Sequence, residues 1–122
     1  MSFSSSTKDA KESSLKFNLH TLRSQIELYK VHHLGTYPAI TEGSLPQLTG
    51  ATNVDGEVGT AGSDYPYGPY VDNALPANPF NQSSAVVAGT GDAVVAGGAG
   101  WQYDANTGAI WPNDSEDHLT YR

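Results

Sequence analysis

The side chains best suited to metal chemistry are the four histidines. His20, His32 and His33 fall in one stretch of the sequence, but neighbouring residues on a helix point about 100° apart. One zinc ion would therefore need ligands from elsewhere in the chain. His32 and His33 lie near a predicted helix end, where the helix dipole favours cations. We interpret them as helix-end residues and predict no zinc site.

Carboxylates near the C-terminus are the second group of side chains that could bind a metal ion. Asp114, Glu116 and Asp117 lie close together, and such hard oxygen ligands suit calcium. The usual calcium-loop pattern of alternating acids around a glycine is missing, so a solvated acidic loop is the plain alternative. The chain also has no cysteine, no Gly-x-Ser-x-Gly elbow and no His-Glu-x-x-His pair. We therefore predict neither catalytic nor cofactor-binding residues, and no enzyme.

Aromatic side chains form the third group. Tyr65, Tyr67 and Tyr70 lie in a stretch rich in Pro and Gly, whereas Trp101 and Trp111 lie in predicted strands. Aromatic faces can stack on sugar rings, so an extracellular carbohydrate-binding or adhesive module is one candidate function. More often such residues fill a thin core. Because alternate positions of a strand face one side, we predict core packing for both tryptophans.

A helix must position the first part of the chain. No Gly or Pro occurs from Thr7 to His33, and one apolar stripe recurs at steps of three and four residues, which predicts an amphipathic helix over 7–34. Gly35 supplies the expected stop. The stripe consists of Leu15, Leu19, Leu22, Ile26 and Tyr29.

The two ends of this helix have different expected roles. Leu22, Ile26 and Tyr29 belong to the continuous part of the stripe, so we predict that they pack on the domain. The first two turns are polar and are expected to project from the head. Leu15 and Phe17 lie near that bare end, so we predict that they contact neighbouring subunits.

The rest of the chain indicates loops followed by β-structure. Residues 35–84 are rich in turn formers, with a short helix or turn expected at Leu48. Residues 85–88 and 93–96 are near copies separated by a turn, which predicts a hairpin. Residues 101–103 and 109–111 predict a second hairpin. The predicted fold is α+β: a single domain over 1–122, with a long N-terminal helix packed on a small antiparallel sheet over 85–113 and a tail over 114–122.

Composition excludes some partners and supports others. The chain has 122 residues and a net charge of -7, so its field repels nucleic acid. No stretch reaches the ~20 apolar residues that span a bilayer. A soluble chain with an under-packed helix front is expected to be the soluble part of a longer protein, with Met1 and Ser2 interpreted as an added start.

Several segments resemble the type IV pilin-like family, in particular the major pseudopilins of type II secretion. Residues 19–30, followed by residues 33–38, are similar to the helix end and the Gly-x-Tyr-Pro exit of those proteins. Residues 100–104 and 110–113 resemble the closing hairpin of proteins with a prepilin-type start. Residues 76–80 fall where the family has a Pro-bearing loop, although Asn78-Pro79-Phe80 stands in place of the familiar Asp-Pro-Trp-Gly.

The resemblance implies a structural subunit of a type IV pilus-like or type II secretion pseudopilus filament. Its partners would be like subunits, minor pilins and the assembly machinery, with Tyr65, Tyr67 and Tyr70 as candidate loop contacts. An apolar segment ahead of this sequence would hold the subunit in the inner membrane before it joins a periplasmic or extracellular filament. The resemblance also implies calcium in a C-terminal loop, although the acids here do not align with the family's ligands. Secretion, motility, adhesion and DNA uptake all remain open.

Overall fold

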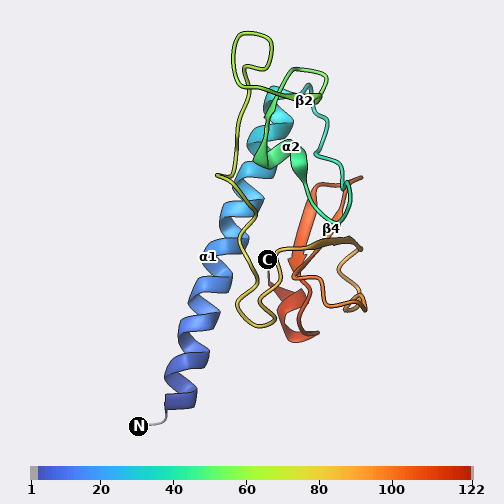
Figure 1. Cartoon of the computed structure of the whole chain (residues 1–122). Coiled ribbons are helices and arrows are strands. Elements are labelled where there is room, and N and C mark those ends of the chain that lie inside the picture. The colour runs from blue at the N-terminus through green and yellow to red at the C-terminus, as the bar shows by residue number, and fades with distance from the viewer. Residues whose placement is uncertain (1–2, 122) are drawn as a thin grey trace.

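The computed structural model describes residues 3–121 as one long helix beside a head of loops and short strands (Figure 1). Helix α1 has 30 residues, about 45 Å at 1.5 Å per residue. The elements are, in order, α1 (Phe3–His32), α2 (Pro46–Thr49), β1 (Ala51–Thr52), β2 (Val58–Gly59), β3 (Val86–Ala88), β4 (Trp101–Asp104), β5 (Ala109–Pro112) and the 3-10 helix η1 (Asp117–Thr120). The predicted α+β class is confirmed.

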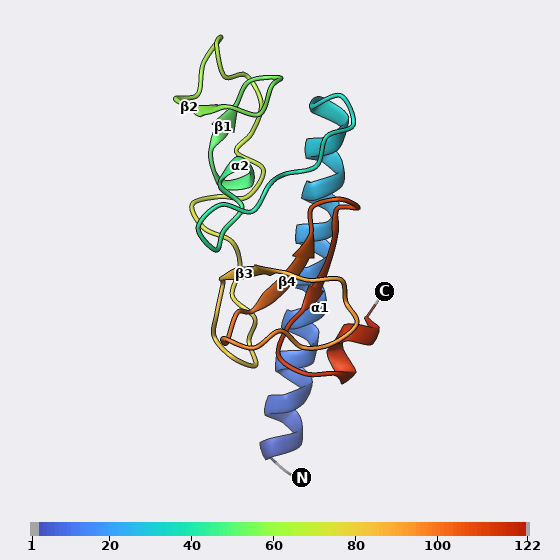
Figure 2. The ribbon, with the colours of Figure 1, turned by 90° about the vertical axis from the view of Figure 1, so that its right-hand side faces the viewer.

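The end of α1 agrees with the sequence pattern. Helical residues stop at His32, and the next turn takes left-handed backbone at Leu34 (φ 59°) and Gly35 (φ 86°). The Gly35 amide donates to the Lys30 carbonyl at 3.0 Å, which satisfies one of the open carbonyls of the last turn. The chain then turns back along the head (Figure 2).

The core lies between one face of α1 and the sheet. The helical stripe from Leu15 to Tyr29 is buried against aromatic and aliphatic side chains of the head. Each fully buried Leu or Ile contributes about 1.5–3 kcal/mol by leaving water. Core packing is confirmed for Leu22, Ile26, Tyr29 and Trp101, whose side chains are at most 1% exposed.

The first predicted hairpin is wrong. Residues 86–88 do form β3, but β3 pairs in parallel with β4, and residues 93–96 form no strand. Side chains hold the backbone of that segment instead. Asn113 accepts a bond from the Val95 amide and donates one to the Val95 carbonyl, while Gln102 donates to the Ala93 carbonyl. The buried side-chain amides of Gln102 and Asn113 thus make the hydrogen bonds that were expected from a partner strand. The sheet is mixed, because β3 pairs in parallel and β5 antiparallel with β4.

The second hairpin is confirmed and explains why the core prediction for Trp111 is wrong. β4 pairs antiparallel with β5, with Trp101 opposite Pro112 and Gln102 opposite Trp111. Residues opposite each other share a face, so Trp111 lies on the face away from α1. It is only partly buried there, beneath the loop at Gly91, where an added Cβ would come within 2.6 Å of the indole ring.

The region over 35–84 contains more structure than expected. The short helix at Leu48 is present as α2, and β1 and β2 form a small second sheet that the sequence pattern missed. These elements lie at the end of the molecule where α1 finishes, away from the N-terminus (Figures 1 and 2).

Candidate functional site

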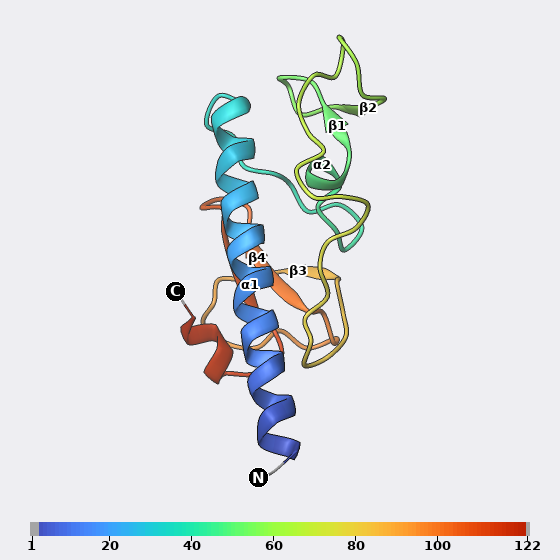
Figure 3. The ribbon, with the colours of Figure 1, turned by 90° about the vertical axis from the view of Figure 1, so that its left-hand side faces the viewer.

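The outer face of α1 carries apolar side chains that nothing in the described chain covers. Phe17 is 70% exposed, Leu28 42% and Val31 74%. At about 3.6 residues per turn these three positions fall on one side of the helix, opposite the buried stripe. Figure 3 shows α1 in front of the strands β3 and β4. The helix is therefore apolar on two faces but packed on only one.

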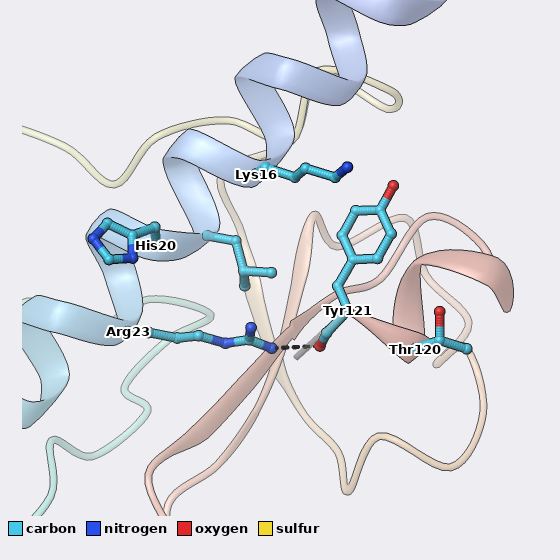
Figure 4. A pocket seen from close by; sticks show the side chains of 6 residues that line it. Lys16, His20, Arg23, Thr120 and Tyr121 are labelled. Carbon is cyan, nitrogen blue, oxygen red and sulfur yellow. Dashed lines mark hydrogen bonds between the residues drawn. The ribbon is translucent and has the colours of Figure 1, made fainter.

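A groove of about 480 Å³ runs along one flank of α1, between the helix and the end of the chain. Lys16, His20 and Arg23 line its helix side, and Thr120 and Tyr121 line the other (Figure 4). The Arg23 guanidinium donates to the Tyr121 carbonyl at 2.8 Å and to the Ile110 carbonyl at 2.9 Å. Lys16 lies over the Tyr121 ring, 5.4 Å from its centroid.

A C-terminal cluster, defined as Glu12, Asp114, His118 and Tyr121, ties the end of the chain to the first half of α1. His118 Nδ1 lies 2.6 Å from Asp114 Oδ2, and its Nε2 lies 2.9 Å from Glu12 Oε1. The Tyr121 hydroxyl donates to the other oxygen of Glu12. Because both ring nitrogens face carboxylate oxygens, both must donate, which favours the charged imidazolium.

The protonation of this cluster follows from those contacts. Burial alone would lower the pKa of His118, but the hydrogen bonds and charges of Glu12 and Asp114 outweigh it and raise that pKa. The hydrogen bond from Tyr121, joined by the contact with His118, lowers the pKa of Glu12. Burial and the Glu12 carboxylate raise the pKa of Tyr121 to about 12. In this cluster the imidazolium of His118 lies between the carboxylates of Asp114 and Glu12, and the neutral hydroxyl of Tyr121 donates to Glu12.

Comparison with known proteins identifies the family. A family model described as type II secretion system (T2SS), protein G, matches residues 2–99. This chain belongs to that family. It is a pseudopilin, a structural component of the type II secretion system. A search of curated proteins and a search of solved structures each give no significant match.

The match ends before β4, so the closing hairpin and three members of the C-terminal cluster, Asp114, His118 and Tyr121, lie outside the matched region, whereas Glu12 lies inside it. Membership places it with other pseudopilins of the secretion machinery, in the cell envelope. Over residues 3–121, no helix is both long and apolar enough to cross a bilayer.

The calcium site implied by the resemblance does not fit the acids that were expected to form it. Asp114 already accepts from His118 and from the Asn78 amide at 2.9 Å. Glu116 accepts from the Val94 amide at 3.1 Å. Within the described part of this pseudopilin, no three His, Asp or Glu side chains are grouped to hold a metal ion. The C-terminal acids hold the loops in place through hydrogen bonds.

The tyrosines of the Pro- and Gly-rich stretch lie against the end of α1 and the small sheet. The Tyr70 hydroxyl bonds His32 Nδ1 at 2.7 Å, and Tyr67 stacks on His32 with centroids 5.1 Å apart. Tyr65 covers Gly59, where an added Cβ would come within 2.4 Å of its ring. All three are partly buried against other parts of the pseudopilin itself.

The two residues predicted to contact neighbours near the bare helix end separate onto opposite faces. Leu15 is fully buried in the core cluster, whereas Phe17 is exposed. A two-residue step turns about 200° around a helix, so only Phe17 is available to another subunit. The exposed Thr7–Ala10 turn agrees with a projecting front, but Glu12 is already engaged by the head.

Sequence reasoning missed the C-terminal cluster and the outer stripe of α1. Glu12 and His118 are 106 residues apart, and no local spacing relates them. The outer stripe did leave a signal. Phe17, Leu28 and Val31 share a helical period of their own, and a second apolar face on a helix is the mark of a second packing partner.

Proposed function

We propose that this pseudopilin is a filament subunit that packs with like subunits through the outer face of α1, defined by Phe17, Leu28 and Val31. The proposal rests on one observation: three large apolar side chains lie in line on a helix whose opposite face is already buried. Burying such side chains against another chain gains the same apolar contact that the inner face gains within the head.

The geometry of the helix supports packing along its length. α1 is about 45 Å long by its residue count. The centre of its outer face is uncharged, with Phe17, Ser24, Leu28 and Val31 in line. Uncharged helix faces with small and apolar residues allow close approach of a second helix. The role is structural, and the partners are copies of this chain together with other pseudopilins of the machinery.

The test is a double variant, Phe17→Ser with Val31→Ser, produced in a strain that carries the rest of the secretion system. We expect filament formation and secretion to fall at least ten-fold while the melting temperature of the isolated domain stays within a few degrees. Val94→Ser is the matched control, because Val94 is an exposed valine on a loop of the head, 36% exposed. Normal filaments from the double variant would contradict the proposal.

A further inference from the structure

Charge is divided unequally between the helix and the head. Five of the six Lys and Arg residues lie on α1, and the sixth is Arg122. The stretch 33–121 holds ten of the 13 acidic residues and no Lys or Arg. A head with this composition repels a second head and attracts the cationic flank of a second helix.

The cations of that flank converge on the groove between α1 and the C-terminal residues. Figure 4 shows Lys16 and Arg23 extending from the helix toward Tyr121, whereas the His20 ring points away from Tyr121 at the edge of the groove. Arg23 is held by the Ile110 and Tyr121 carbonyls, which fixes its charge at the groove floor. Asp9, Glu12 and Glu27 are the acids on the same flank, and Glu12 is already bonded to His118 and Tyr121.

A complement on the described surface is the acidic tip, defined as Asp55 and Glu57 on the turn between β1 and β2. Both side chains are exposed, and β1 and β2, which flank this turn, lie at the end of the molecule where α1 finishes (Figure 2). The backbone amides of Asp55 and Glu57 both donate to Asn53 Oδ1, which fixes the shape of this turn. The tip therefore presents negative charge on an ordered turn.

We propose that the groove lined by Lys16, His20 and Arg23 receives the acidic tip of a second copy of this chain. The proposal rests on the filament function and deepens it, because it names a second contact beside helix packing. The β1–β2 turn lies at the end of the molecule where α1 finishes, and the C-terminal segment, whose Thr120 and Tyr121 line the groove, lies lower along α1 (Figures 1 and 2). Copies stacked in the same direction bring the tip of one toward the groove of the next.

The contact is heterologous, since the two surfaces differ. A heterologous contact does not satisfy itself in a pair, and where the rotation between copies does not close a ring it produces an open filament with a direction. The outer face of α1 supplies apolar contact, and the tip and groove select the order of the subunits. Because the pairing is between exposed charges, it weakens as salt rises.

Disulfide trapping tests this contact, and the absence of native cysteine makes each probe unique. Thr120→Cys places a thiol at the groove, and Val54→Cys places one beside the tip; both positions are exposed and neither change removes a charge. Mixed under oxidising conditions, the two variants are expected to cross-link at least five-fold faster than Thr120→Cys mixed with Val94→Cys. A chain carrying both cysteines is expected to give a ladder of covalent oligomers.

Charge reversal completes the test. Adding Lys16→Glu to the Thr120→Cys chain should abolish its excess cross-linking to the Val54→Cys chain. Adding Asp55→Lys and Glu57→Lys to the Val54→Cys chain should then restore the cross-linking. Equal rates with Val54→Cys and Val94→Cys, or a Lys16→Glu variant that cross-links like its parent, would overturn the inference. Filaments that form in cells while tip and groove fail to cross-link would overturn it alone and leave the filament function standing.

Discussion

The two faces of α1 share one helix and similar side chains but differ completely in their surroundings. On the inner face, Leu22 and Ile26 are 0% exposed and contact the sheet. On the outer face, Leu28 and Val31 lie outside the core cluster and remain 42% and 74% exposed. The inner face accounts for the fold of the domain, whereas the outer face has no purpose within a single copy.

This difference indicates which properties belong to the monomer and which to the assembly. An apolar side chain that stays in water contributes almost nothing to folding, and a row of them favours association. Substitutions on the inner face should therefore act on stability first, and substitutions on the outer face should act on assembly first. Each prediction below tests that separation, from the largest expected loss of stability to the smallest.

Leu22→Ala should have the largest effect. Leu22 is fully buried between α1 and the sheet, and truncating a buried leucine leaves a cavity that costs about 2–5 kcal/mol. Urea unfolding followed by circular dichroism measures this loss as a lower midpoint. An unchanged midpoint would show that the inner face is not the core of the domain.

His118→Gln should have an intermediate effect that depends on pH. The contacts to Glu12 and Asp114 raise the pKa of His118, so their contribution is complete below the unfolded value near 6.5 and is lost as pH rises through the folded pKa. The lowered pKa of Glu12 keeps its own contribution above the unfolded value of 4.5. We expect a loss of about 1–2 kcal/mol at pH 5.5 and a smaller loss at pH 8.5.

The measurement is the free energy of unfolding of parent and variant across that pH range. Asp92→Asn serves as the control, because Asp92 is an exposed acid outside the cluster. A His118→Gln loss that grows as pH rises would mean that the imidazole is neutral in the folded protein, contrary to the cluster described above.

Leu28→Ala should have the smallest effect on stability. Leu28 stands on the outer face, and surface substitutions away from specific contacts usually change stability by less than about 0.5 kcal/mol. It is the matched counterpart of Leu22→Ala, with the same residue type, the same helix and the same truncation. Equal losses for the two variants, measured by urea unfolding, would remove the distinction between the faces.

The sequence predicted the elements whose signal is local. The stripe from Leu15 to Tyr29 repeats with the period of a helix, and the second hairpin has a turn between two aromatic strands, so both were found. The first hairpin failed because the echo between residues 85–88 and 93–96 is a local pattern. The pairing of residues 93–96 is instead decided by Gln102 and Asn113, two buried amides whose reach is tertiary.

The candidate site was predicted only in part, for related reasons. Phe17 was found because it stands near a bare helix end, but Leu15 was grouped with it although helical rotation separates the two. Trp111 was placed in the core with Trp101, although strand register puts them on opposite faces. The cluster at His118 joins the two ends of the chain, so only the folded structure brings its members together.

The most direct test of the account is the solvent accessibility of the outer face of α1 before and after assembly. A single cysteine at Val31→Cys, in a chain with none of its own, reacts with a maleimide wherever it meets water. We expect fast labelling in the isolated domain and strong protection in assembled filaments, while Val94→Cys is labelled in both. Equal labelling of Val31→Cys in the two states would contradict burial of this face between subunits.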